Sequence, residues 1–446
     1  MMRLSFRIAV TLGLFVCLKF VLTNSIVSAQ EWPQFRGPHG SGIADATTLP
    51  VTWSETENVT WKTELPGRGW SSPVISGKYI WMTTGIETAA TPEELAKKFE
   101  GRSDAKSLQL AAKVSLRAIC VDRESGKLIQ NVPLFELDYP DPIHALNSYA
   151  SPTPVICGDR VFCHFGNYGT ACVGLADGKV LWKTEQFKYD PQNGPGASPV
   201  AWKNLLIFNC DGRDVQFIVA LDQADGKTVW QTNRSGKLPD NNDFKKAYCT
   251  PTIIDDPQHP QLISPASDWV YSYDPATGQE LWRANYGQLG FSTVPKPLIG
   301  NGKVYVLTSF MSSRLLAIKF DGHGDVTETH VNWKEDRNMP SKPSMLLIDD
   351  RLYAVNDKGI LTCLDANSGE MVWRERVDGD YAASPLYGAG HIYLFNQNGE
   401  TTVVQPGDEF KKVASNKLDG SFMASPAVAG NALFLRTDKA LYRVEE

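Results

Sequence analysis

The chain has 446 residues, a formal net charge of −6 and 42% hydrophobic residues. This composition is typical of a soluble globular protein, and the length suffices for several domains or for one large repeat array. The acidic balance disfavours nucleic acid and anionic membranes as main partners, because both select clustered lysine and arginine.

The first 29 residues are typical of an export signal. Two arginines precede an apolar stretch from Ile8 to Leu22, and small residues then lead to Ala29, where cleavage is expected. The alternative is an uncleaved anchor, which Lys19 and the short apolar run disfavour. We therefore predict a signal peptide over residues 1–29, export to the periplasm or the cell exterior, and no transmembrane span after cleavage.

One sequence phrase recurs along most of the remaining chain. A Ser/Thr-Pro opening precedes short apolar runs separated by turns, and the phrase ends in Asp-x-x-x-Gly-x-x-x-Trp. Self-similarity at a period of roughly 40–50 residues predicts a repeat architecture. The aspartate and glycine suit a tight turn, and the tryptophan can fill the seam to the next repeat. The clearest glycine–tryptophan pairs are Gly178 and Trp182, Gly226 and Trp230, Gly278 and Trp282, and Gly369 and Trp373.

The openings and the two ends of the array predict the fold. An outer strand without a repeat of its own lies near Trp61, whereas the last repeat lacks an outer strand, so the two complete each other. This is how a β-propeller closes and leaves no sheet edge open. We predict an all-β, eight-bladed propeller of four-stranded antiparallel blades, closed by its N- and C-terminal strands, as a single monomeric domain over residues 30–446. The openings lie at Ser72, Ser151, Ser198, Thr250, Val294, Lys342, Ser384 and Ser425.

An insertion interrupts the first repeat between its second and third strands. From Thr91 to about Lys113 the period becomes helical, with Thr91 as N-cap, Pro92 at the first helical position and Glu94 completing a capping box. We expect a small helical insertion at about residues 91–113 that decorates one rim.

The cysteines include one candidate disulfide. Cys163 and Cys172 are placed symmetrically about Asn167 and Tyr168, so a two-residue turn would set them opposite each other. An exported protein can oxidise such a pair. Buried free thiols remain the alternative. No Cys-x-x-Cys pair and no clustered histidines occur, so no metal site is predicted.

Aromatic residues recur just before the openings, where the loops of a closed propeller meet around one mouth of the central channel. Such a circle can stack on a flat cofactor, a sugar or a peptide side chain. The alternative is that each ring only packs against the next blade. Arg68, Lys342, Asp378 and Asp380 are candidates for nearby polar contacts. The candidate ligand-binding aromatics are Trp70, Tyr149, Tyr248, Phe291, Tyr381 and Phe422.

The repeats resemble the PQQ-like repeat, the tryptophan-docking repeat of quinoprotein dehydrogenases, over nearly the whole mature chain. The resemblance covers cofactor-free propellers such as the assembly propeller of the Bam complex as well as true dehydrogenases. It is specific for fold and weak for activity, since the repeat motif holds blades together. Quinoprotein alcohol dehydrogenases carry adjacent cysteines beside PQQ and hold a calcium ion, and this chain offers neither an adjacent cysteine pair nor an assignable ligand set.

Two functions follow. The first is an exported binding or scaffolding module for a protein or polymer partner, which the bare loops favour. The second is a PQQ- and calcium-dependent dehydrogenase of alcohols or sugars, which the repeat family and the aromatic circle favour. We expect the first, with catalytic residues unknown and no cofactor assigned.

Overall fold

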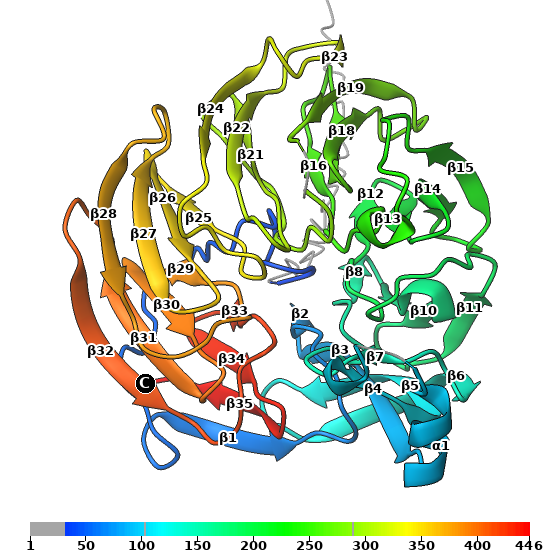
Figure 1. Cartoon of the computed structure of the whole chain (residues 1–446). Helices are drawn as coiled ribbons and strands as arrows, with labels where there is room; N and C mark the ends of the chain where they lie inside the picture. The colour runs from blue at the N-terminus through cyan, green and yellow to red at the C-terminus, as the bar shows by residue number, and fades with distance from the viewer. Residues whose placement is uncertain (1–31, 102–103, 288–289) are drawn as a thin grey trace, which may run out of the picture.

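The structure, a computed structural model, describes residues 32–101, 104–287 and 290–446. Eight sheets are arranged as blades around a central axis, and each contains four antiparallel strands (Figure 1). The predicted eight-bladed propeller is therefore confirmed. Blade four has in addition a short fifth strand, β23 (Gly324–Asp325), which pairs parallel with its outer strand. The expected signal peptide lies outside the described residues. Among the described residues, no helix is long and apolar enough to cross a membrane.

Seven blades are formed by consecutive stretches of the chain, and in each the strands follow one another from the axis outward. Blade one contains β2 (Val74–Ser76), β3 (Tyr79–Ala89), β5 (Ala111–Asp122) and β6 (Leu128–Asp138), and blade two contains β8 (Val155–Cys157), β9 (Arg160–His164), β10 (Thr170–Gly174) and β11 (Val180–Thr184). Blade three contains β12 (Val200–Trp202), β13 (Leu205–Asp211), β14 (Gln216–Asp222) and β15 (Thr228–Asn233), and blade four contains β16 (Thr252–Ile254), β17 (Gln261–Pro265), β18 (Trp269–Tyr273) and β19 (Glu280–Asn285). Blade five contains β20 (Leu298–Gly300), β21 (Lys303–Leu307), β22 (Leu315–Lys319) and β24 (Val331–Glu335). Blade six contains β25 (Leu346–Ile348), β26 (Arg351–Val355), β27 (Ile360–Asp365) and β28 (Met371–Arg376). Blade seven contains β29 (Leu386–Gly388), β30 (His391–Phe395), β31 (Glu400–Gln405) and β32 (Lys411–Lys417).

Blade eight closes the ring with strands from both ends of the described chain. Its three inner strands are β33 (Ala427–Ala429), β34 (Ala432–Arg436) and β35 (Ala440–Val444), and its outermost strand is β1 (Val59–Glu64). β1 pairs antiparallel with β35, with Thr63 opposite Leu441. This is the predicted closure, and it removes the open edge that the last repeat would otherwise present.

Tryptophans on the outer strands connect neighbouring blades. The Trp230 indole N–H donates to the Pro275 carbonyl in the turn of blade four at 3.1 Å, and a Cβ at Gly278 in that turn would overlap the Trp230 ring. A side chain there would collide with the indole, so glycine is required. Trp182 and Trp373 likewise donate to carbonyls of the following blade. Trp282 differs, because its indole donates to Gln261 Oε1 within its own blade.

The insertion in blade one is less helical than expected. The helix α1 spans only Pro92–Lys98, with Thr91 as N-cap and the predicted capping box with Glu94. A short 3₁₀ turn and β4 (Leu108–Gln109) follow, and β4 pairs with β7 (Ile143–His144). The helical expectation up to Lys113 is wrong because the residues from Ala111 onward pair with β3 and belong to β5. From Val114 to Ala118 they alternate between buried and half-buried, the two-residue period of a strand.

The candidate disulfide between Cys163 and Cys172 is not formed, and the alternative of buried free thiols holds. The turn joining β9 to β10 is a three-residue 3₁₀ turn, Gly166–Tyr168, and not a two-residue hairpin turn. This shifts the register by one residue, so Cys163 lies opposite Ala171 and Cys172 lies opposite Phe162. A one-residue shift sends the two side chains to opposite faces of the sheet. Both are buried free thiols.

Residues 32–44, which we call the plug, cross the axis on the face opposite to the aromatic loops. The Trp32 N–H donates to the Ile75 carbonyl of blade one at 3.1 Å, and the Ala44 N–H donates to the Tyr387 carbonyl of blade seven at 2.8 Å. The Arg36 guanidinium donates to the carbonyls of Met345 and Pro385, between the plug and blades six and seven. The plug therefore ties distant blades together at one end of the channel.

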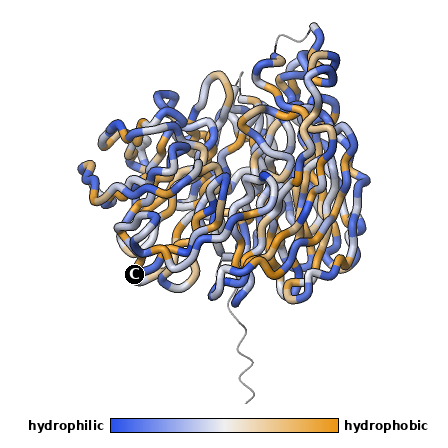
Figure 2. The backbone as a smooth tube through the Cα atoms, turned by 90° about the horizontal axis from the view of Figure 1, so that it is seen from below, coloured by the Kyte–Doolittle hydropathy of each residue, from blue (hydrophilic) through white to orange (hydrophobic). Residues whose placement is uncertain are grey.

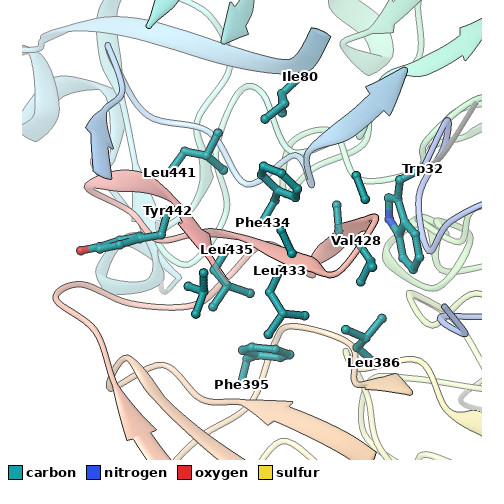
Figure 3. Close-up of a cluster of buried hydrophobic side chains, with 14 of the residues drawn as sticks. Trp32, Ile80, Leu386, Phe395, Val428, Leu433, Phe434, Leu435, Leu441 and Tyr442 are labelled. Carbon is teal, nitrogen blue, oxygen red and sulfur yellow. The ribbon is translucent and has the colours of Figure 1, made fainter. Parts of the chain in front are cut away.

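The apolar core runs along the seams between blades. Seen from its edge, the ring has hydrophobic segments mainly within the blades and hydrophilic segments at the turns (Figure 2). Figure 3 shows one such cluster, in which Phe434 of β34 points toward Ile80 of blade one while Leu433 points toward Phe395 of blade seven. Trp32 of the plug packs beside Val428 of the same blade. The alternation along β34 thus joins two neighbours of the closing blade.

Candidate functional site

A cavity of about 1070 Å³ lies on the axis of the ring. Residues from all eight blades line it, together with part of the blade-one insertion, and Phe35 of the plug also borders it. Because the plug closes the opposite face, the cavity has one mouth, on the side of the loops that enter the innermost strands. This is the place at which the aromatic circle is expected.

The structure brings only three of the six predicted aromatics to this cavity. Trp70, Tyr248 and Phe291 line it. Tyr149, Tyr381 and Phe422 instead lie in the hydrophobic clusters between blades, where each is at most 1% exposed. The expected circle of six is therefore wrong for these three. Their loops turn the ring toward the neighbouring blade, where burying a large aromatic surface is favourable.

The aromatic wall that does form has a different composition. Phe244 packs against Phe291 with ring centroids 4.7 Å apart, and Phe310 meets Phe291 edge-on at 5.8 Å. The Lys246 ammonium lies 5.3 Å from the Phe291 ring centroid and donates to the Asp243 carbonyl. Burial lowers the pKa of Lys246 to about 8. Phe244 and Phe310 were not predicted, since neither stands in the repeated position before an opening.

The mouth is rimmed by exposed apolar side chains. Leu146 is 49% exposed and Phe310 is 59% exposed, and both line the cavity. Met311, beside Phe310, is 64% exposed. On the Leu146 side, the Trp70 indole N–H donates to the Leu146 carbonyl at 3.0 Å. We call Trp70, Leu146, Phe310 and Met311 the apolar rim.

Charged groups around the mouth are mostly paired. Lys342 forms an ion pair with Asp357, and Lys358 pairs with Asp380 at 3.1 Å. Of the predicted polar candidates, Lys342 lines the cavity itself, whereas Asp380 reaches it only through its partner. Arg68 lies 5.1 Å from the Trp70 ring centroid and donates to the Ala145 carbonyl. Asp378 contributes its backbone carbonyl, which accepts from the Tyr381 hydroxyl at 2.9 Å.

The deep part of the cavity is surrounded by a belt of hydroxyl groups, which explains the Ser/Thr-Pro openings. In each case a backbone N–H donates to the hydroxyl at the same position of the next blade; for example, the Ser384 N–H donates to Ser425 Oγ at 2.9 Å and the Ser425 N–H to Ser72 Oγ at 3.1 Å. Seven such bonds of 2.9 to 3.1 Å connect the blades. We call these residues the hydroxyl belt: Ser72, Thr153, Ser198, Thr250, Ser344, Ser384 and Ser425.

The belt shows that three predicted openings were placed too early in the chain, and that one of its eight positions has no hydroxyl. In blades two, five and six the belt position lies two residues beyond the expected opening, at Thr153, Lys296 and Ser344. The eighth position is thus occupied by Lys296, which has no hydroxyl, although its backbone N–H donates to Ser344 Oγ at 2.9 Å. No backbone bond to a belt hydroxyl is formed between Thr250 and Lys296 within the described part of the chain.

Lys296 and Arg36 are two buried cations between the belt and the plug; neither borders the cavity itself, and the Lys296 ammonium lies against Gly40 of the plug. Lys296 is 3% exposed and Arg36 is 2% exposed. Burial, with a further contribution from the positive charge of Arg36, lowers the pKa of Lys296 to about 7. Burial also lowers the pKa of Arg36 to about 9. Within the residues that the structure describes, neither has a carboxylate within 4 Å, and Arg36 Nε has no hydrogen-bond partner.

The side chains present do not fit a calcium-supported quinone. Two of the carboxylates that line the cavity are already engaged, since Asp243 pairs with Arg213 at 3.2 Å and Asp357 pairs with Lys342. No group of three or more histidine, cysteine, aspartate and glutamate residues is placed to hold a metal ion in the described ranges. Calcium needs several oxygen ligands, most of them carboxylates, converging on one point.

Eight blades around an axial cavity, most of them with a tryptophan on the outer strand, define a PQQ-like repeat propeller. Residues 43–232 and 266–408, about three quarters of the chain, match the family described as outer membrane protein assembly factor BamB, and the chain belongs to that family. A curated relative, outer membrane protein assembly factor BamB of Alkalilimnicola ehrlichii, is 31% identical over 111 residues, which cover 25% of this chain and 26% of that protein. The match thus spans about a quarter of that relative.

Solved structures show the same fold at low identity. BamB from Moraxella catarrhalis is 13% identical with a TM-score of 0.51, covering 81% of this chain and 99% of that one. A europium-containing methanol dehydrogenase is 10% identical with a TM-score of 0.59, covering 91% of this chain and 88% of that one. Because binding proteins and enzymes share this architecture, the likeness carries the fold and leaves the function to the site.

Proposed function

We propose that this chain is an exported, monomeric binding propeller that holds a segment of a partner protein at the mouth of its axial cavity. The observation that carries this proposal is the apolar rim, where Leu146 and Phe310 line the cavity while about half exposed, and where Met311 beside Phe310 is 64% exposed. Exposed apolar patches beside a cavity mark protein interaction sites, because covering them removes apolar surface from water.

The family and the donor set of the site support the same proposal. The family is described as an outer membrane protein assembly factor, which favours a protein partner in the cell envelope. Export through the predicted signal peptide would deliver the chain to that compartment. Two carboxylates that line the cavity, Asp243 and Asp357, already form ion pairs with basic side chains. The site is therefore better suited to binding a partner than to holding a metal ion.

A photo-crosslinking amino acid placed on the rim tests the proposal. It would replace Phe310 or Leu146 in the full chain, expressed in its native host, and Val413 in a matched control. Val413 is 41% exposed on β32, the outermost strand of blade seven, so its exposure is similar while its location differs. We expect a discrete crosslinked protein from both rim positions and none from Val413. No product from the rim, or the same product from all three positions, would overturn the proposal.

The competing dehydrogenase function is measured on the same purified protein. Calorimetric titration with PQQ, with and without calcium, is followed by a dye-linked assay on alcohols and aldose sugars. We expect neither a saturating heat nor turnover, because the aromatic wall offers stacking but the carboxylates are paired. Calcium-dependent binding at one site per chain, with turnover, would replace the binding function by the enzymatic one.

A further inference from the structure

The hydroxyl belt has hydrogen-bond donors that the protein itself does not use. Each belt hydroxyl accepts one backbone N–H, and no protein acceptor for its own hydrogen is found in the described ranges. A hydroxyl whose oxygen accepts a bond still has its hydrogen to donate. All seven belt residues line the cavity, although each is at most 6% exposed. The belt therefore presents a circle of donors to whatever occupies the deep cavity.

The charges beneath the belt have the sign that complements such donors. Lys296 takes the eighth belt position, and its ammonium has neither an ion-pair partner nor a hydrogen-bond acceptor in the part of the chain that the structure describes. Arg36 adds a second buried cation with an unpartnered Nε. Burying a charge without a counter-charge is costly, so both groups would be stabilised by an anion placed nearby.

We propose that the hydroxyl belt is a binding site for one oxyanion, a carboxylate, in the deep part of the axial cavity, and that the buried cations Lys296 and Arg36 beside the belt favour negative charge there. Hydrogen bonds to a charged acceptor are stronger than neutral ones, so several weak hydroxyl donors can jointly hold a carboxylate. The cavity is continuous from the apolar rim to the belt, since Leu146, Phe310 and the belt residues border the same space. A carboxylate entering through the mouth can reach the site.

The choice of a carboxylate rests on the proposed function, whereas the anion site itself does not. A protein partner carries carboxylates on its acidic side chains and at its C-terminus without any modification, so a partner held at the rim can extend one into the belt. The site can be tested on the purified full chain with no partner present. Its failure is therefore distinguishable from failure of the crosslinking experiment.

Fluorine NMR with trifluoroacetate measures the site directly, because this probe is a small carboxylate that stays ionised at all working pH values. We expect a saturable shift of the fluorine signal, displaced by acetate. 2,2,2-Trifluoroethanol, similar in shape but neutral, should show no saturable shift. Equal responses to both probes would overturn the proposal by showing apolar binding alone, and so would the absence of a saturable response to trifluoroacetate.

Three variants locate the site. Lys296→Met removes the charge at similar volume, and Ser198→Ala removes one belt hydroxyl. Thr252→Val is the matched control, since its buried hydroxyl donates to the Pro297 carbonyl at 3.1 Å and lies outside the belt. We expect the dissociation constant to rise by about tenfold in Lys296→Met and by less in Ser198→Ala, with no change in the control. If Lys296→Met does not fold, Ser198→Ala still decides, and unchanged affinity in the folded belt variants would refute the site.

Competition and pH give two further readouts. Displacement of trifluoroacetate by sulfate but not by acetate would identify an inorganic oxyanion and overturn the carboxylate assignment.

The groups that face Lys296 are Arg36 from the plug and the Cys249 thiol from the loop before β16. Since the pKa of Lys296 lies at about 7, the affinity should fall by about tenfold between about pH 6 and pH 8 in the wild type. A pH-independent affinity would contradict the role of Lys296.

Discussion

The two ends of the channel differ in how far their large side chains are buried. At the plug end Trp32 and Arg36 are both 2% exposed and are bonded to strands or loops of several blades. At the mouth, Leu146 and Phe310 are 49% and 59% exposed. One end is completed by the chain itself, whereas the other leaves apolar surface uncovered.

This difference separates residues that hold the ring from residues that are free to bind. The plug uses its side chains to satisfy carbonyl groups of blades six and seven, so changes there should appear as lost stability. The rim is mostly surface, so changes there should leave stability intact and alter only what the protein contacts. The hydroxyl belt lies between the two ends and belongs to both, because it connects the blades and also borders the cavity.

The largest expected effect is at the plug. Arg36→Ala removes the guanidinium donors to the carbonyls of Ser41, Met345 and Pro385, of which the last two lose a buried hydrogen bond. We expect the free energy of unfolding to fall by about 3 kcal/mol, measured by chemical denaturation. Arg376→Ala is the control, since Arg376 lies exposed on the outermost strand of blade six, and should change stability by at most about 0.5 kcal/mol. Similar losses in both variants would contradict a special role of the plug.

The fold could be predicted from the sequence because its signals are local and repeated. Each Asp-to-Trp phrase specifies a turn and an outer strand, and the orphan strand near Trp61 predicts the closure. The positions of the aromatics could not be predicted, because Trp70 and Tyr149 both stand two residues before a predicted opening, whereas Tyr149 in fact stands four residues before its belt position, Thr153. Only packing decides which ring turns into a blade seam and which turns toward the axis.

The details at the axis depended on register, which short patterns specify weakly. The openings at Ser151, Val294 and Lys342 stand two residues before the true belt positions, because Pro152, Pro295 and Pro343 imitate the repeated dipeptide. The turn after Cys163 holds one residue more than expected, which was enough to separate the cysteines. The belt was nonetheless visible in the sequence as the recurring Ser/Thr-Pro pair, although its role as a circle of donors was not.

The second prediction is that the effect of Lys296→Met on the free energy of unfolding depends on pH. A lysine with a pKa of about 7 in the folded state and about 10.4 when unfolded destabilises the fold fully below pH 7, and the penalty disappears as the pH rises between these values. The difference in unfolding free energy between Lys296→Met and the wild type should therefore change by up to about 1.4 kcal/mol per pH unit across that window. Denaturant unfolding at several pH values measures this. A constant difference would mean that Lys296 keeps its proton in the folded state.

The smallest effect is expected at the rim, where it bears most directly on function. Phe310 touches Phe291 only edge-on at 5.8 Å and is 59% exposed, whereas Phe291 is 3% exposed. Phe310→Ala should change the free energy of unfolding by at most about 0.5 kcal/mol, while Phe291→Ala should cost about 3 kcal/mol. With the crosslinker at Leu146, Phe310→Ala should still weaken capture of the partner. A large stability loss in Phe310→Ala would make that residue part of the core, and the mouth would then resemble the plug end, with its apolar surface serving the fold and not a partner.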